Sequence, residues 1–277
     1  MLNMVFDGNI SNNGSIKLQY NDRAAVEVKI KDRNFVAEYN RPEKGHERPF
    51  FDATLIQTPI VFDLIDFFDG VNRLKAQKEM EYGMIYEFSY PYIVWDLYRK
   101  ISNKNSFPKT KSWGLISETI QHIIGGEFKK EGQKLSYNKY FTGKVLQIEI
   151  ANTAFGVKSF GVLQLLNNNG FLDKKYVLIL DEPEVHLHPA WQLKYAEIIA
   201  ELVKAGIYVI VNSHSPYMIE ALKVYSDKCG ITGKTNFYLA EKNSDGLMST
   251  TKDVTHDLEP IFKKLADPYK ILDSLER

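Results

Sequence analysis

Two acidic side chains directly follow an apolar run in the C-terminal half of the chain. Tyr176–Glu184 reads YVLILDEPE, so the carboxylates of Asp181 and Glu182 stand where a hydrophobic stretch ends. Such a run is typical of a strand buried on both faces of a parallel sheet, whose ligands bind at the carboxyl edge. There one carboxylate can hold Mg²⁺, directly or through water, while its neighbour polarises an attacking water. An acidic loop after a core strand has the same pattern, so this segment alone leaves both interpretations open.

A histidine follows the next apolar run. Val209–Tyr217 reads VIVNSHSPY, which places His214 one strand–helix–strand unit beyond the two acids. Parallel strands joined by one helix end at the same sheet edge, so we expect Glu182 and His214 to emerge together. A histidine there can hydrogen-bond a γ-phosphate or the attacking water. A lone histidine is more often structural, but LDEPExHLHP followed by NSHSP in this order and spacing is far more specific.

Together these segments resemble the ATP-binding cassette (ABC) class of P-loop ATPases, in the branch that includes RecF, the SMC proteins and the overcoming-lysogenisation-defect (OLD) ATPases. The resemblance extends over residues 145–240. It implies that Leu178–Glu182 is the Walker B strand, in which Asp181 binds Mg²⁺ and Glu182 is the catalytic glutamate. It also implies that His214 is the switch histidine and that the nucleotide is ATP.

The segment Asn152–Phe160 (NTAFGVKSF) lies where this family carries its signature motif. Gly156 opens a predicted helix, so backbone N–H groups and the positive end of the helix dipole would face a phosphate. Family members usually have a serine before this glycine, whereas this chain has Phe155, which removes one hydroxyl donor. Lys158 or Ser159 could replace that donor. We therefore expect ATP to contact Gly156, Lys158 and Ser159.

No segment of the chain matches a P-loop, which requires G-x-x-x-x-G-K-[ST] with lysine directly after the second glycine. Around Gly156 the match fails because Val157 precedes Lys158, and Ala151 stands where the first glycine belongs. In the family the P-loop (Walker A) lies upstream of the Q-loop, and Gln57 in LIQTP resembles the Q-loop glutamine that contacts Mg²⁺. Without a P-loop the β- and γ-phosphates lose most of their backbone donors. We therefore expect a truncated ATPase or a subunit that is naturally deficient in hydrolysis.

Two other enzyme classes match parts of the same region. His186 and His188 form an H-x-H pair beside Glu184, a pattern that also occurs in zinc hydrolases. The Leu-His-Pro loop that crosses the dimer interface of the ABC class accounts for these histidines and for LDEPE as well, and we prefer it. An OLD-type nuclease needs a further C-terminal module with its own acidic cluster, which is longer than the segment after Ala240.

The elements that carry these residues alternate between strand and helix. Apolar runs predict strands at Val145–Ile150, Tyr176–Leu180 and Ile207–Val211. Amphipathic patterns predict helices at Lys158–Asn168, from Pro189 to Leu202 and at Tyr217–Val224, with two short helices in the tail, Asp257–Leu275. Gly170 is placed to stop the first helix, and Pro189 to open the second. Short connections between them indicate a parallel sheet covered by helices.

The upstream part has a different pattern. Ser15–Tyr20 and Ala25–Ile30 alternate apolar and polar residues, as antiparallel strands do, whereas residues 61–141 indicate irregular helices. We predict an α/β fold with a parallel-sheet ABC ATPase-like core, an N-terminal antiparallel β lobe and a helical insertion. The expected parts of this one ATPase-like domain are residues 1–60 (β lobe and Q-loop-like segment), 61–144 (helical basic insertion) and 145–277 (Walker B and switch-histidine core).

The insertion is basic. Arg99–Lys144 holds ten Lys and Arg against three Glu, a net +7 in a chain whose 35 Lys and Arg balance 35 Asp and Glu. Aromatic residues such as Tyr137 and Tyr140 lie among the lysines, a mixture that suits phosphate contact and base stacking. Nucleic acid is therefore a possible partner through Arg99–Lys144. A solvated lobe that balances the acidic remainder is the interpretation we prefer.

Composition narrows the class of protein. With 44% hydrophobic and 25% charged residues the chain is not disordered as a whole. The lone cysteine, Cys229, allows no internal disulfide and fits a reducing compartment. The longest apolar runs, YVLIL and IYVIV, are too short to span a membrane, and MLNMVFDGN is not a secretory signal. We expect a cytoplasmic protein.

Two functions fit these features. In the first, the chain is the catalytic half of an ABC-type ATPase that uses ATP and Mg²⁺ at composite sites. Those sites would form in a homo- or hetero-dimer with another ABC-type ATPase protomer. In the second, the chain is a scaffold or partner subunit without hydrolysis of its own. The affinity of the chain for ATP separates the two.

Overall fold

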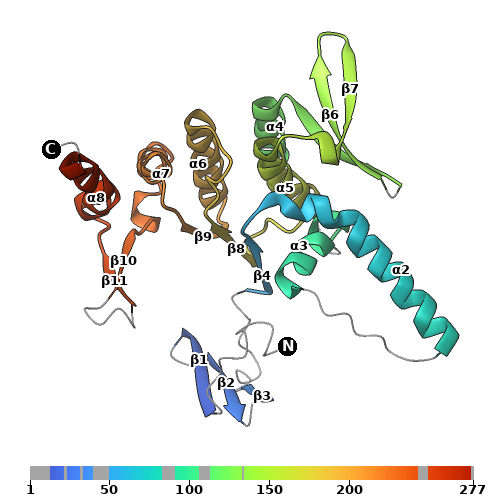
Figure 1. Cartoon of the computed structure of the whole chain (residues 1–277), viewed down its shortest axis with the longest axis horizontal. Coiled ribbons are helices and arrows are strands. Elements are labelled where there is room, and N and C mark those ends of the chain that lie inside the picture. The colour runs from blue at the N-terminus through green and yellow to red at the C-terminus, as the bar shows by residue number, and fades with distance from the viewer. Residues whose placement is uncertain are drawn as a thin grey trace. The chain divides into compact units, whose positions relative to one another are not determined.

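The computed structural model describes residues 13–21, 24–31, 34–39, 50–82, 91–105, 113–132, 134–242 and 249–275. The chain forms two compact units, Met1–Pro49 and Phe50–Arg277, each of which is described by itself. Figure 1 labels their helices and strands. The three-part division expected from the sequence, with boundaries after residues 60 and 144, stays a prediction.

The N-terminal unit contains an antiparallel sheet. Its strands pair in the order β1-β2-β3 and are β1 (Asn13–Asn21), β2 (Ala24–Lys31) and β3 (Asn34–Tyr39). Ser15 pairs with Lys29, and Val28 pairs with Ala37. The alternation of apolar and polar residues predicts these strands, and the antiparallel arrangement is confirmed.

A parallel sheet forms the centre of the second unit. Its strands pair in the order β4-β8-β9 and are β4 (Asp52–Ile56), β8 (Tyr176–Asp181) and β9 (Tyr208–Asn212). Leu180 lies between Ile56 and Val211 in register, and Asp181 is opposite Asn212. The prediction that the two apolar runs form adjacent parallel strands is confirmed. The combination of this sheet with helices and antiparallel sheets also confirms the predicted α/β fold class.

The three helices predicted before, between and after β8 and β9 are present, and each is longer than expected. They are α5 (Phe155–Asn169), α6 (Pro189–Lys204) and α7 (Pro216–Lys228). Gly170 ends α5 in the left-handed conformation, at φ 84°, and Pro189 is the first residue of α6. Leu178 and Leu180 of β8 belong to the same buried core as Phe160 of α5. The helices therefore hold the sheet whose edge carries the predicted site.

The segment between β4 and α5 begins with helices and ends with strands. It consists of η1 (Pro59–Leu64), α2 (Ile65–Tyr82), α3 (Tyr92–Ser102), α4 (Trp113–Ile124), β5 (Gly126–Glu131), β6 (Lys134–Phe141), β7 (Lys144–Glu149) and η2 (Ile150–Asn152). The strands pair as the antiparallel sheet β5-β6-β7, so the helical prediction is wrong for residues 126–141. Phe128 and Tyr137 pack into the core from facing positions of β5 and β6, which favours strand over helix.

The C-terminal part contains η3 (Thr232–Lys234), the antiparallel pair β10 (Tyr238–Lys242) and β11 (Ser249–Asp253), and α8 (Glu259–Leu275). The prediction of two short helices in the tail is wrong, because α8 continues through Pro268. Val254, Leu258 and Ile261 bury their side chains together with Ile219 of α7. This packing holds the first turns of α8 in place. In the described part of the chain, helices with the length and apolar character to cross a membrane do not occur.

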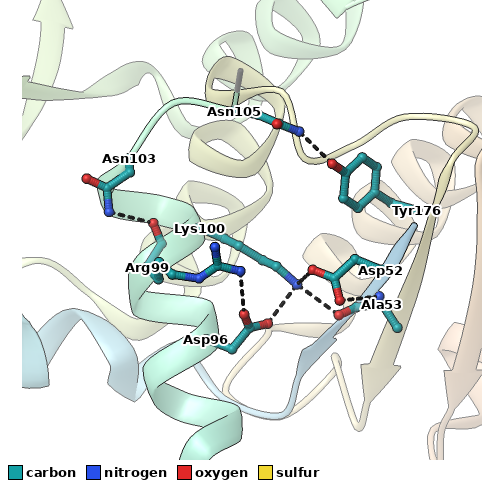
Figure 2. Close-up of polar contacts among 8 residues, drawn as sticks. All are labelled: Asp52, Ala53, Asp96, Arg99, Lys100, Asn103, Asn105 and Tyr176. Carbon is teal, nitrogen blue, oxygen red and sulfur yellow. Dashed lines mark hydrogen bonds and ion pairs between the residues drawn. The ribbon is translucent and has the colours of Figure 1, made fainter. Parts of the chain in front are cut away.

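A buried lysine connects α3 to β4 (Figure 2). The side chain of Lys100 is 0% exposed. Its Nζ donates to the carbonyl oxygen of Ala53 at 2.8 Å and lies 2.6 Å and 2.9 Å from carboxylate oxygens of Asp96 and Asp52. Arg99 contacts the other Asp96 oxygen at 2.9 Å. A buried ammonium needs such partners, and here they fix the start of the strand whose far end leads to Gln57.

Candidate active site

The carboxyl ends of β4, β8 and β9 bring four predicted site residues together at one edge of the parallel sheet. Gln57 follows β4, Asp181 ends β8, Glu182 comes next, and His214 lies two residues after β9. The Gln57 amide lies 3.3 Å from Asp181, and the His214 ring lies 3.4 Å from Glu182. These contacts join residues up to 124 positions apart in the sequence.

Asp181 is held by two neutral amides. Its Oδ2 accepts from Gln57 Nε2 at 3.3 Å, and its Oδ1 accepts from Asn212 Nδ2 at 3.2 Å. Both bonds are long, and a cation can displace neutral donors of this kind. Asn212 is not among the predicted site residues, although its position at the end of the second buried strand places it opposite Asp181 in register.

The donor set fits Mg²⁺ bound together with a phosphate. Mg²⁺ takes oxygen ligands and is commonly held by one or two carboxylates together with substrate phosphates. Asp181 and Glu182 supply such carboxylates, and Gln57 supplies an amide oxygen. In the described ranges, groups of three or more His, Cys, Asp or Glu placed to hold a metal by themselves are not found. A metal ion at this edge would therefore depend on the nucleotide for part of its coordination.

Glu182 has a strained backbone beside an exposed carboxylate. Its φ is 49°, in the left-handed region that residues other than glycine rarely adopt. The Glu182 N–H donates to the carbonyl oxygen of Asn212 at 2.9 Å, and the Val185 N–H donates to the carbonyl oxygen of Glu182 at 3.1 Å. The side chains of Glu182 and His214 are 49% and 81% exposed. Both groups can therefore meet a ligand at the sheet edge, and strain of this kind is frequent at functional sites.

The predicted signature residues lie at the N-terminus of α5. The N-cap residue, Ala154, has no side-chain acceptor for the first N–H groups of the helix. Ser159 lines the same hollow as Gln57 and Glu182, and its hydroxyl donates to the carbonyl oxygen of Phe155 at 3.1 Å. The free helix end is compatible with an anion, as the sequence predicts for this segment.

Lys158 and Gly156 occupy tighter surroundings. The side chain of Lys158 is 2% exposed, and its Nζ lies 2.6 Å from Asp63 Oδ1. It would have to leave this carboxylate to donate to a phosphate. A Cβ at Gly156 would lie 3.4 Å from the side chains of Leu187 and Trp191, which is ordinary van der Waals contact.

The two histidines of the H-x-H pair have structural partners. His188 caps α6, because its Nδ1 accepts from the Ala190 N–H at 3.2 Å. The His186 ring lies 5.0 Å from the Phe155 ring. Each histidine therefore has a contact within the chain, and that of His188 stabilises the start of α6.

Several basic side chains of Arg99–Lys144 form ion pairs or hydrogen bonds within the chain. Four described cations form ion pairs: Arg99 and Lys100 with Asp96, Lys129 with Glu127, and Lys134 with Glu149. The Lys130 ammonium donates to the carbonyl oxygen of Ser102 at 3.1 Å. Lys109 and Lys111 lie outside the described residues. Nucleic-acid contact through Arg99–Lys144 stays a prediction.

Part of the chain matches a known protein-family model. Residues 92–219 match a family model described as an AAA ATPase domain. The match runs from α3 to the first turn of α7 and includes Asp181, Glu182 and His214. The match agrees with the prediction of an ATPase domain over this part of the chain.

Individual relatives are distant. The Septu protein PtuA of Bacillus thuringiensis is 26% identical over 131 residues, which cover 47% of this chain and 30% of PtuA. The SMC head domain from Thermotoga maritima has 13% identity and a TM-score of 0.42, over 89% of this chain and 77% of that one. An SMC head bound to the C-winged helix domain of ScpA has 13% identity and a TM-score of 0.46, over 90% and 75%. The chain thus matches under a third of the length of PtuA.

Proposed function

We propose that the chain is the catalytic half of an ABC-type ATPase, which hydrolyses ATP at a composite dimer site when a P-loop completes the phosphate pocket. Glu182 is the general base, His214 contacts the γ-phosphate, and Asp181 with Gln57 holds Mg²⁺. The observation that carries the proposal is the meeting of these four side chains at one edge of the parallel sheet, with Glu182 and His214 3.4 Å apart.

The chain's own groups suit this division of work. The exposed Glu182 carboxylate can accept a proton from an attacking water, and His214 beside it can donate a hydrogen bond to the γ-phosphate. Asp181 and Gln57 would hold the metal ion, while Asn212, which donates to Asp181 Oδ1, helps to orient the carboxylate. Mg²⁺, when bound, neutralises charge on the β- and γ-phosphates.

The same proposal assigns the N-terminus of α5 to a second protomer's nucleotide. In the ABC class the signature segment of one protomer caps the ATP held by the other. Gly156 and the uncapped first turn of α5 offer backbone N–H groups for this contact. Phe155 replaces the usual serine, and Lys158 is engaged by Asp63, so we expect this cap to be weaker than one with a serine hydroxyl.

A scaffold without hydrolysis is the alternative. The observation that favours it is the lack of a G-x-x-x-x-G-K-[ST] segment in the 277 residues. In that case the chain would still cap the ATP of a P-loop-bearing protomer through Gly156, while Glu182 would have no nucleotide to act on.

One assay separates the two functions. The chain is mixed with the P-loop-bearing N-terminal segment of a longer homologous protein, without that protein's own catalytic glutamate, so that the P-loop can complete the site of Glu182, and ATP turnover is measured. Hydrolysis by this chain predicts turnover that Glu182→Gln lowers by about 100-fold or more, as expected for loss of a general base. The control Glu220→Gln, an exposed acid on α7, should leave turnover unchanged.

The outcomes are distinct. Turnover that is equal in the chain and in Glu182→Gln would refute the catalytic role of this glutamate. If the mixture with this segment shows no turnover, but the chain stimulates the full-length relative and Gly156→Asp abolishes that stimulation, the scaffold alternative is correct.

A further inference from the structure

The buried side chain of Glu184 joins the two loops that carry Glu182 and His214. The residue is 9% exposed and belongs to the loop that follows β8, two positions after Glu182. A buried carboxylate needs hydrogen-bond donors to offset the loss of water. Glu184 finds them on the loop after β9, which carries His214.

Three donors converge on one oxygen of this carboxylate. Glu184 Oε1 accepts from the Ser213 hydroxyl at 2.8 Å, from the His214 N–H at 2.7 Å and from the Ser215 N–H at 3.1 Å. Hydrogen bonds to a charged acceptor are stronger than those between neutral groups. The backbone on both sides of the His214 Cα is thus attached to the loop after β8.

A second contact supports the same connection. The Ser215 hydroxyl donates to Gln192 Oε1, and Gln192 Nε2 donates to the carbonyl oxygen of Leu187 at 3.1 Å. Ser215 Oγ also accepts from the Met218 N–H at 3.3 Å, which caps α7. The loop after β9 is therefore bound to the loop after β8 at two points, by Glu184 and through Gln192.

The imidazole of His214 depends on this backbone for its position. Its side chain is 81% exposed, and its contact with Glu182 is 3.4 Å long. Packing therefore does little to select its rotamer, and the backbone sets where the ring begins. A displacement of residues 213–215 would move the ring away from Glu182.

We propose that Glu184 is a positioning residue for His214: it holds the loop after β9 so that the imidazole stays beside Glu182 at the sheet edge. The catalytic consequence rests on the proposed ATPase function, whereas the effect on the loop itself does not. The sequence pattern alone assigns no positioning role to Glu184.

Three substitutions of Glu184 distinguish the effects of the side chain's charge, its length and its hydrogen-bond acceptor. Glu184→Ala removes the acceptor and leaves two N–H groups and a hydroxyl without it. Glu184→Asp keeps the charge but withdraws the carboxylate by one methylene. Glu184→Gln keeps the reach and an acceptor oxygen, and its amide nitrogen would replace Oε2, which has no partner among the described residues. Gln should therefore conserve the loop better than Asp or Ala.

The first experiment measures amide hydrogen exchange at His214 and Ser215 in the full chain without nucleotide. Glu184→Ala should accelerate both by about tenfold or more, because a hydrogen bond to a charged group stabilises by about 1.5 kcal/mol or more. Glu184→Asp should also accelerate them, and Glu184→Gln should stay nearer the unmodified chain. If Glu184→Ala does not fold, the exchange rates of Glu184→Asp and Glu184→Gln are compared instead. The proposal is overturned if the His214 and Ser215 amides exchange as slowly in Glu184→Ala or Glu184→Asp as in the unmodified chain. It is also overturned if the surface control Glu220→Ala accelerates their exchange equally.

The second experiment connects the loop to catalysis in the mixture with the P-loop-bearing segment of the longer homologue. Glu184→Ala should lower kcat and leave KM for ATP unchanged, and adding it to His214→Ala should lower kcat no further. An active mixture in which Glu184→Ala changes exchange but not kcat overturns the positioning role. If the unmodified chain itself shows no turnover, the proposed ATPase function fails, while the exchange data still decide whether Glu184 holds the loop.

Discussion

Replacing Lys100 with methionine tests the contact that joins α3 to β4 (Figure 2). The substitution keeps an unbranched apolar stem but removes the ammonium that contacts Ala53, Asp52 and Asp96. The side chain of Asp96 is 12% exposed, so its carboxylate loses a partner where water has little access. Asp52 is 43% exposed and can regain water.

The magnitude follows from these surroundings. Breaking a buried ion pair from one side costs about 3–5 kcal/mol. Asp96 keeps its contact with Arg99 at 2.9 Å, which places the expected loss at the low end, about 3 kcal/mol. For a unit of this size, 1 kcal/mol lowers the melting temperature by about 2–4 °C. We therefore expect Lys100→Met to melt about 6–12 °C below the unmodified chain.

Thermal unfolding followed by circular dichroism measures this difference. The control is Lys263→Met, which removes an exposed ammonium 2.8 Å from Glu259 on α8 and should change the midpoint little. Equal midpoints for Lys100→Met and Lys263→Met would show that the buried lysine adds no stability. The account of the α3–β4 connection would then be wrong.

Three further outcomes are expected. Gly161→Ala should lower the free energy of unfolding in urea by about 1–3 kcal/mol, because the added Cβ would lie 2.3 Å from the buried Phe128 ring. The control Gly114→Ala adds a Cβ where there is open space, so it should not destabilise the chain. Burial and the Asp69 carboxylate raise the pKa of Tyr98 from 10 to about 12, so the free energy of unfolding should fall as the pH rises through this interval. The fall should be less steep in Tyr98→Phe, and equal dependence of stability on pH in the two proteins would contradict this prediction. The chain by itself should hydrolyse ATP well below about 1 s⁻¹, and faster turnover that Glu182→Gln abolishes would show that the phosphates are held without a P-loop.

The arrangement of β8 and β9 could be predicted because it depends on local pattern and simple topology. Two apolar runs joined by one amphipathic helix leave few alternatives to adjacent parallel strands. Residues at the ends of those strands must then lie at the same edge, which is why Asp181, Glu182 and His214 could be placed together. The nearby Asn212 follows from the same register and could have been included.

The errors have a common physical origin in contacts between distant segments. Strands β5 and β6 carry many lysines, and their strand character depends on Phe128 and Tyr137, which pack into the shared core. The burial of Lys100 and Lys158 could not be expected either, since lysine is rarely buried without a partner. Their carboxylates include Asp52 and Asp63, which lie 48 and 95 positions away in the sequence.

A nucleotide-bound structure is the most direct measurement of the central claim. The chain is crystallised with the P-loop-bearing N-terminal segment of the longer homologue, Mn²⁺ in place of Mg²⁺, and a non-hydrolysable ATP analogue, and the metal is located by its anomalous signal. The account predicts a metal peak bound by Asp181, directly or through one water, with the γ-phosphate facing Glu182 and His214. A metal and γ-phosphate bound elsewhere, with Asp181 and Glu182 left in solvent, would contradict it.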